Sequence, residues 1–469
     1  MSKSNTSTKA NVFYNILLTS ITYITGFVTY PYITRVLGVE NIGMVSFVDK
    51  TIDSFLLFAT LGIGVVGVRA IATSEDSKQL EKTFSSLVSA LILSHFIIIL
   101  LFLIVILCVD TYSPYRKYLY IGLSRMISSI FMVEWYFQGT SNFKYVTIRS
   151  VVIRIISIVL IFVFVRNADD ITKYYIICCG TAVVNAGVNW IMTQRELSFS
   201  LDFSGCRTYL SPMIIFGVYS ILNATFSSFN YLFLGFLCSD IDTGYYATAD
   251  KLYSIILSAI SAFTAVMLPK MSSLAQKEDK ADFVLLIEKS FTLILAFCIP
   301  LATFGSFFSE EIVHVIAGDG YEGAVLPLRI MMILIFINGI NQIFIIQVAI
   351  PLKLDKHITI GTALAAVISI PLNIILVGKF AAVGSSLVLV TSVIIANVLP
   401  ITVIIQKYNY LVPFKKILVL LGLSMPYILI TVLIKYTCDQ GFISFIIAGV
   451  CYSLYFVLLN NRLLKVYLK

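Results

Sequence analysis

Long apolar runs constrain this chain more than any motif does. About fourteen stretches of roughly 20–27 residues are predominantly apolar, and each is long enough to cross a bilayer as a helix. None shows the ten-residue alternation that is typical of a membrane β-barrel strand. We therefore predict an all-α integral membrane protein, with spans near 12–36, 44–70, 84–109, 115–137, 145–165, 171–192, 209–235, 243–268, 284–308, 324–350, 358–377, 381–405, 415–434 and 441–460.

The composition excludes a soluble fold. Of the 469 residues, 59% are hydrophobic and only 12% are charged, and the mean hydropathy is +0.94. So few polar residues cannot cover a water-exposed surface, which makes lipid the main solvent. The longest loops, such as 196–209 and 271–283, are too short to fold as soluble domains. We therefore expect no nucleotide-hydrolysing domain and, because the first apolar run has the length of a full span, no removable signal peptide.

The distribution of lysine and arginine predicts the orientation. With the N-terminus in the cytoplasm, 20 of the 33 Lys and Arg residues lie in cytoplasmic segments, 7 lie in the opposite loops and 6 lie within spans. Positive residues gather on the cytoplasmic side of membrane proteins. We therefore predict a multi-pass protein with both termini in the cytoplasm. The net charge of +8 follows from this bias and gives no reason to expect nucleic acid as a partner.

One charged segment occurs twice. Gly43–Lys50 (GMVSFVDK) returns 201 residues later as Gly244–Lys251 (GYYATADK), with Gly, Asp and Lys in the same positions. The same shift relates polar positions from residue 19 to residue 69, which indicates an internal duplication. Two related halves in a membrane protein are typical of a transporter whose site lies between the repeats.

Charged residues inside the apolar spans are candidates for function. They are Asp49, Lys50 and Asp53 in the second span, and Asp250 and Lys251 in the eighth. A charge in hydrocarbon costs roughly 2.5–3.5 kcal/mol on insertion scales, so it should face a partner or water. We predict that the two lysines attract an anionic headgroup and that the three carboxylates exchange H⁺ or Na⁺. The alternative is that each Asp–Lys pair compensates locally and only holds its helix.

Three arginines are further candidates for substrate binding. Arg125 lies in the fourth span, Arg154 in the fifth, and Arg35 at the end of the first. Arginine suits phosphate because its planar guanidinium donates two hydrogen bonds at once and stays charged. The alternatives are a structural ion pair of Arg125 or Arg154 with Glu134, and for Arg35 a side chain that reaches the lipid headgroups.

Polar residues line one face of the first and seventh spans. Their spacings of three and four residues place them on a single helical face. From them we select Thr22, Asn223 and Asn230 as candidate contacts to a polar substrate. The alternative is hydrogen bonding between helices. The complete sets are Asn15, Thr19, Thr22, Gly26 and Thr29, and Ser220, Asn223, Ser227 and Asn230.

No pattern indicates catalysis or metal binding. The three histidines and eight cysteines match no metal-ligand spacing, and no P-loop, Ser-His-Asp or HExxH pattern occurs. The GxGxxG of Gly62, Gly64 and Gly67 lies inside a predicted span with no strand before it, which favours helix packing over a dinucleotide site. We predict a protein that is not an enzyme and that has no metal and no cofactor.

Several segments resemble the polysaccharide-repeat-unit flippases (O-antigen, Wzx-type) of the multidrug/oligosaccharidyl-lipid/polysaccharide exporter superfamily. They are Thr34–Gly38 (TRVLG), Glu134–Gly139 (EWYFQG) and Gly244–Lys251 with the later Leu268-Pro269-Lys270, and the resemblance covers nearly the whole chain. Trp135 and Tyr136 within EWYFQG are expected to anchor at the membrane interface. The resemblance implies the cell inner membrane and two pseudo-symmetric six-helix lobes plus two C-terminal helices. It places the N-lobe at 1–208, the C-lobe at 209–410 and the helix pair at 411–469.

The predicted function is therefore to flip undecaprenyl-diphosphate-linked oligosaccharide from the cytoplasmic to the outer leaflet by alternating access, driven by a gradient or the membrane potential. Besides this lipid-linked oligosaccharide and the bilayer, a polysaccharide polymerase is an expected partner. The alternatives are a cation-coupled multidrug exporter and a lipid II flippase of the same superfamily. A membrane-embedded glycosyltransferase or O-antigen polymerase is disfavoured, since no loop is long enough to carry the extramembrane residues of such a protein.

Overall fold

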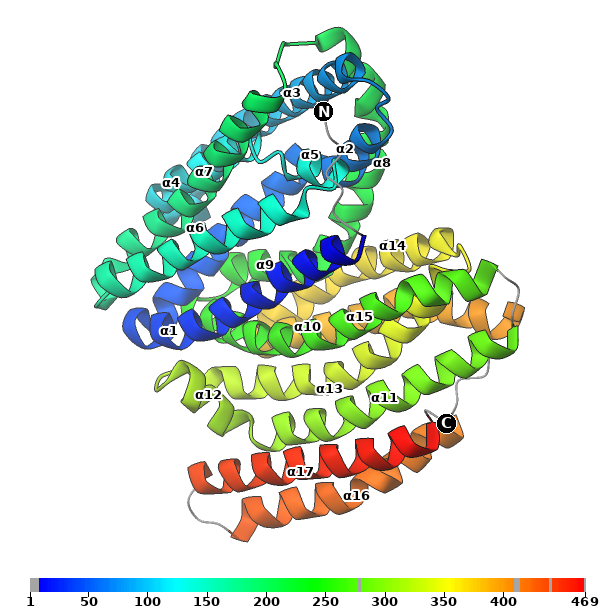
Figure 1. The fold of residues 1–469 in the computed structure, drawn as a ribbon. Helices are drawn as coiled ribbons and strands as arrows, with labels where there is room; N and C mark the ends of the chain where they lie inside the picture. Colours follow the sequence, from blue (N-terminus) through cyan, green and yellow to red (C-terminus); the bar gives the residue numbers. More distant parts are fainter. Residues whose placement is uncertain (1–7, 277–279, 409–413, 438–440, 468–469) are drawn as a thin grey trace. The chain divides into compact units, whose positions relative to one another are not determined.

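The computed structural model describes residues 8–276, 280–408, 414–437 and 441–467, and within them it is almost entirely helical and contains no strand (Figure 1). The helices are α1 (Thr8–Thr60), α2 (Ile63–Ala72), α3 (Ser77–Cys108), α4 (Arg116–Ser129), α5 (Glu134–Gly139), α6 (Phe143–Phe164), α7 (Ile171–Glu196), α8 (Phe203–Ser227), α9 (Phe229–Leu237), α10 (Asp240–Gln276), α11 (Lys280–Phe307), α12 (Ser309–Ala317), α13 (Val325–Gln342), α14 (Asp355–Leu372), α15 (Gly378–Tyr408), α16 (Phe414–Thr437) and α17 (Gly441–Tyr467). Short π-helical segments follow α13 and α14, at Ile343–Ala349 and Asn373–Val377.

The predicted membrane class is confirmed. In the described chain, nine helical stretches are long and apolar enough to cross a membrane, and the bent pair α8–α9 would make a tenth. Two of the nine are 48 and 52 residues long, about twice the length of one crossing. One of these contains part of α1, in which two helical segments meet at Gly38, where the φ of 76° breaks the helix. The total of fourteen spans stays a prediction.

The chain forms two compact units, Met1–Phe236 and Leu237–Lys469. In the first unit, α1 packs against α3, α4, α6 and α8, and α7 packs against α4 and α6. In the second, α13 packs against α10, α11 and α15, and α14 packs against α15. The structure groups α8 with the helices that precede it, whereas the lobe boundary expected after residue 208 assigns this segment to the second lobe. The three lobe ranges stay a prediction.

Besides the span at 209–235, which bends between α8 and α9, two predicted spans of the first unit are broken. The span at 44–70 breaks at Leu61 and Gly62, where φ is 43° and 71°, so that α2 begins as a separate helix. The span at 115–137 breaks at 130–133, between α4 and α5. The two short helices that follow the breaks, α2 and α5, pack against each other.

Neighbouring side chains on α3 hold both breaks. The Ser94 hydroxyl donates to the Ala59 carbonyl at 2.6 Å, just before the first break. The His95 Nε2 lies 2.7 Å from the Ser129 hydroxyl, just before the second break. Both α3 residues are buried. Ser94 thus supplies a donor to a backbone carbonyl next to the first break, and His95 ties α3 to the last residue of α4.

The break before α5 changes the environment of two aromatic residues. Trp135 and Tyr136 are only 4% and 1% exposed, so the expectation that they anchor at the membrane interface is wrong. They lie in an apolar core built from α2, α3, α5 and α8. A Cβ atom at Gly67 of α2 would lie 2.8 Å from the Trp135 ring, which shows how closely the indole approaches this glycine. The glycine therefore lets α2 and α5 approach closely, and helix packing is the role that the sequence favoured for this motif.

A side chain at Gly62 is expected to destabilise the protein. An added Cβ would lie 2.6 Å from the Phe216 Cβ and 2.9 Å from the Gly217 nitrogen of α8, and the positive φ adds strain. We expect Gly62→Ala to lower the free energy of unfolding by roughly 1–3 kcal/mol. The matched control is Gly64→Ala on the exposed side of α2, where a Cβ meets nothing within 4 Å. Thermal unfolding in detergent measures both, and equal effects would contradict the packing argument.

Serines of α3 fix the segment between α7 and α8. The backbone N–H groups of Ser200 and Asp202 donate to the hydroxyls of Ser85 and Ser89, at 3.2 and 2.9 Å. The Ser86 hydroxyl donates to the Asp202 carboxylate at 2.7 Å. The same carboxylate caps the start of α8, since it accepts a hydrogen bond from the backbone of Gly205 at 3.0 Å.

This arrangement predicts a pH-dependent contribution to stability. The hydrogen bond from Ser86, followed by those from Gly205 and Ser204, lowers the pKa of Asp202 to about 2. In an unfolded chain the pKa of an aspartate is about 3.9. The contribution of Asp202 is therefore complete above about pH 4 and is lost as the pH falls towards 2. Asp202→Asn keeps the capping oxygen but cannot titrate, so the difference in melting temperature between wild type and variant should shrink between pH 5 and pH 2.5. A difference in melting temperature that stays constant over this pH range would contradict the prediction.

The last two helices pack on α11 in the second unit. Lys435 of α16 forms an ion pair with Glu311 of α12, whose side chain is 10% exposed. This partly buried contact joins the C-terminal helix pair to a residue that lies 124 positions earlier in the chain.

Candidate functional site

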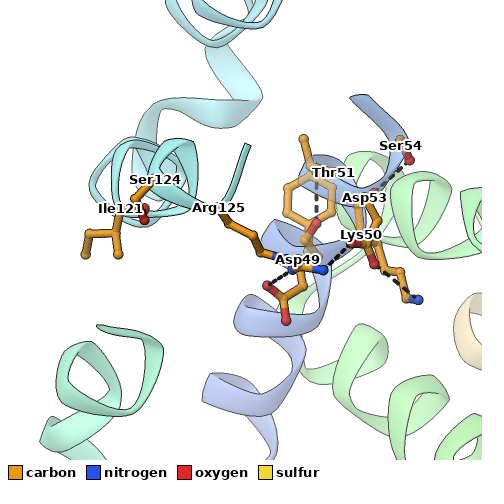
Figure 2. A network of polar contacts seen from close by, with 9 residues as sticks. Asp49, Lys50, Thr51, Asp53, Ser54, Ile121, Ser124 and Arg125 are labelled. Atoms are coloured by element: carbon orange, nitrogen blue, oxygen red, sulfur yellow. Dashed lines mark hydrogen bonds and ion pairs between the residues drawn. The ribbon is translucent and has the colours of Figure 1, made fainter. Parts of the chain in front are cut away.

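Arg125 joins two carboxylates of α1 (Figure 2). Its guanidinium lies 3.1 Å from Asp49 Oδ1 and 2.5 Å from Asp53 Oδ1. Asp49 and Asp53 are four residues apart and share one face of the helix. The Lys50 ammonium lies 3.7 Å from the other oxygen of Asp53. We call these four residues the charge network; it contains two positive and two negative groups.

Close packing of α4 on α1 positions the network. A Cβ at Gly122 of α4 would lie only 2.0 Å from the Ile52 Cδ1 of α1, so a glycine here allows the two helices to approach. Arg125 follows Gly122 by about one helical turn. Its side chain therefore reaches Asp49 and Asp53, which lie on either side of Ile52.

The charge network is partly open. The side chains of Arg125, Asp49, Asp53 and Lys50 retain 29, 36, 31 and 33% of their accessible surface. Charges in apolar spans are expected to face partners or water, and each of these four side chains has an ion-pair partner within the first unit.

Helix α9 contributes an aromatic contact to the network. The Lys50 ammonium lies over the Tyr231 ring, 5.5 Å from its centroid. Nearby, the Phe47 ring of α1 contacts Phe236 of α9 at a centroid distance of 5.7 Å and Tyr112 at 5.8 Å. Lys50 is therefore held between a carboxylate and an aromatic face, which limits its freedom to act as an isolated cation.

Arg154 differs from Arg125. Its Nη1 lies 3.5 Å from the Thr25 hydroxyl of α1, and in the described chain no carboxylate forms an ion pair with it. Its half-buried position on α6 leaves a guanidinium in an apolar span with only a weak neutral contact. An anion would find this arginine less occupied than Arg125.

The sequence suggested the wrong ion-pair partners for Glu134. Glu134 pairs with Arg149, not with Arg125 or Arg154. The reason is the break before α5, which places Glu134 at the start of a separate helix beside α6. The Arg149 side chain is only 4% exposed.

The remaining predicted residues form no hydrogen bond or ion pair with the charge network that the described contacts record. Arg35 is exposed and donates to the Pro31 carbonyl of its own helix at 3.0 Å. Asn223 is half-buried on α8 and Asn230 is buried on α9. Asp250 and Lys251 are half-buried on α10, in the second unit. The side chain of Thr22 lies outside the described residues.

Sequence reasoning missed Tyr175, Tyr231 and Arg149. The two tyrosines lie in ordinary apolar runs, where aromatic residues carry no distinguishing signal. In the described residues, no group of three or more His, Cys, Asp or Glu is arranged to hold a metal ion.

The charge network is suited to an exchange of ionic partners. Arg125 can bind a new anion only if it releases the two carboxylates, Asp49 and Asp53.

Comparisons with known proteins agree on a class of membrane protein. The family described as "Polysaccharide biosynthesis protein" matches residues 8–275. The "Putative O-antigen transporter" of Escherichia coli (strain K12) is 24% identical over 403 residues, which cover 84% of this chain and 95% of that protein. The protein of the same name from Shigella dysenteriae is 22% identical over 270 residues, which cover 57% and 68%.

A solved structure has the same fold. The lipid II flippase MurJ in its inward closed conformation superposes with a TM-score of 0.73, covering 98% of this chain and 100% of that chain. The sequences are 14% identical, so the likeness concerns the fold alone.

Proposed function

Because the chain belongs to the polysaccharide biosynthesis protein family, we propose that it flips undecaprenyl-diphosphate-linked oligosaccharide repeat units across the inner membrane. It is a multi-pass membrane transporter of polysaccharide biosynthesis and not an enzyme. The proposal adds the lipid carrier, the direction from the cytoplasmic to the outer leaflet, and an orientation with both termini in the cytoplasm.

Arg154 is the observation that supports this substrate best. A diphosphate offers two or more anionic oxygens, and a guanidinium that pairs with no carboxylate in the described chain offers matching donors. The polar glycan would use hydrogen-bonding residues such as Asn223, Asn230 and Thr22. Lys251 would serve the second half of the duplication as Lys50 serves the first, and Arg35 is a candidate for the first encounter.

The charge network supports a mechanism based on exchange. A diphosphate would compete with Asp49 and Asp53 for Arg125, and protonation of a carboxylate or binding of Na⁺ would weaken its hold on the arginine. We propose that H⁺ or Na⁺ exchange at Asp49, Asp53 or Asp250 couples a gradient to alternating access of the two lobes. A polysaccharide polymerase would receive the flipped unit.

Transport in proteoliposomes tests the proposed function. Arg154→Ala should slow flipping of a lipid-linked oligosaccharide by about 10–100-fold, since a hydrogen bond to a charged group is worth about 1.5–3 kcal/mol. Arg154→Lys should keep part of the rate because it retains the charge. The matched control is Arg166→Ala, just beyond α6, where the exposed guanidinium donates to the Val163 carbonyl. Lys50→Ala and Lys251→Ala examine the repeated segment.

Each alternative predicts a different result. Flipping at the wild-type rate in the variants at 50, 154 and 251 would contradict headgroup binding at these positions. Export of organic cations by a wild type that moves no glycan-lipid would favour the cation-coupled multidrug exporter. Flipping of lipid II alone would favour the lipid II flippase.

A further inference from the structure

Tyr175 of α7 is buried beside the charge network. The residue is 0% exposed, and its ring contacts Tyr118 at a centroid distance of 5.9 Å. A Cβ at Gly122 would lie 2.9 Å from the Tyr175 hydroxyl oxygen, which places the hydroxyl at the contact between α4 and α1. The hydroxyl is close enough to the Asp49 carboxyl to act on it as a side-chain donor, although it falls short of a hydrogen bond of normal geometry. The network thus borders a third helix, α7.

The Tyr175 hydroxyl makes no hydrogen bond of normal geometry to a described residue. Buried hydroxyls nearly always have a partner, so this one needs an explanation. Asp49 supplies an acceptor: Arg125 binds its Oδ1, while its second oxygen has no ion pair and no hydrogen bond of normal geometry in the described chain (Figure 2). A donor and an acceptor without partners therefore lie near each other.

The two carboxylates of the network differ in their second partners. Asp53 has Lys50 in addition to Arg125. Asp49 has only Arg125 as an ion-pair partner in the described residues. If Arg125 turned away, Asp53 would keep a cation, but Asp49 would lose its ion-pair partner in the described residues unless another donor reached it.

We propose that Tyr175 is this second donor, a positioning residue whose hydroxyl binds Asp49 when Arg125 turns to an anionic group of the substrate. No proton is transferred; one hydrogen bond to the carboxylate replaces another. The proposal rests on the proposed function, in which the diphosphate of the lipid carrier draws Arg125 away. It gives a role to an unbonded hydroxyl at this buried position.

A double-mutant cycle in detergent tests this role without a transport assay. Melting temperatures are compared for wild type, Tyr175→Phe, Arg125→Ala and the double variant. With Arg125 present, Tyr175→Phe should shift the melting temperature by less than about 1 °C, because the hydroxyl is unbonded. With Arg125 removed, the same change should cost at least about 2 °C. Should Arg125→Ala fail to fold, Arg125→Gln replaces it.

Tyr427→Phe is the matched control. Tyr427 is 1% exposed, its hydroxyl also lacks a partner in the described chain, and it lies on α16 in the second unit. Its effect should be the same in both backgrounds. Equal effects of Tyr175→Phe in both backgrounds would overturn the proposal. Coupling between Tyr175 and Arg125 in a protein that moves no glycan-lipid would keep the donor role and refute the substrate.

Discussion

Arg125→Ala is expected to abolish flipping and to destabilise the protein. The change leaves Asp49 and Asp53 without the guanidinium that binds both. Loss of even one hydrogen bond between charged groups costs about 1.5–3 kcal/mol. The side chain is 29% exposed, so the stability loss should stay below that of a fully buried pair. Flipping in proteoliposomes and the melting temperature in detergent measure the two effects.

Controls separate charge from geometry at Arg125. Arg125→Lys keeps the charge but lacks the planar fork, so it should give intermediate transport. Lys117→Ala removes an exposed cation from the same helix and should leave transport unchanged. Normal flipping by Arg125→Ala, together with normal flipping by Asp49→Asn and Asp53→Asn, would show that the charge network only supports the fold.

Arg149→Leu should have the largest effect on stability. The Arg149 side chain is 4% exposed and pairs with Glu134 of α5, while the Tyr145 ring lies 5.8 Å from the guanidinium carbon. Removal of one partner of a buried ion pair typically costs about 3–5 kcal/mol, and because the Glu134 carboxyl that stays behind is 36% exposed, the loss should lie at or below the lower end of this range. The matched control is Lys144→Ala, an exposed cation on the same helix, which should change stability by less than about 0.5 kcal/mol.

A second substitution should reverse most of this loss. Arg149→Leu with Glu134→Gln removes both charges, and replacement of a whole buried pair by neutral groups is often close to neutral. Unfolding temperatures of the two single variants and the double variant measure the coupling. If the fall in unfolding temperature of the double variant equals the sum of the falls in the two single variants, Arg149 supports the core through packing alone.

The sequence was sufficient for the helices because apolar length is a local property. Runs of about 20 residues can be satisfied in lipid only as helices, so most of the predicted spans lie along single observed helices. The breaks at Leu61–Gly62 and at 130–133 were not predictable in the same way. They depend on contacts that distant segments supply, such as Gly217 against Leu61 and Ser94 against Ala59.

The sequence predicted which charged residues gather at the site, but it did not predict which of them form ion pairs. Charge in an apolar span singled out Asp49, Lys50, Asp53 and Arg125, and the structure brings these four together. The sequence contains no information on which carboxylate lies nearest to which cation, so Glu134 was assigned to the wrong arginines. Tyr175 could not be predicted from the sequence, because only the structure places its unbonded hydroxyl beside Asp49.

The ion pair between Lys435 and Glu311 has a consequence for biogenesis. A ribosome that elongates at about 5–20 residues per second needs roughly 6–25 s to make the 124 residues that separate them. During this interval the Glu311 carboxyl has been synthesised but its ammonium partner has not. Nascent chains that stop before Lys435 therefore hold an uncompensated acid, and we expect quality-control proteases to remove them faster than chains that include it.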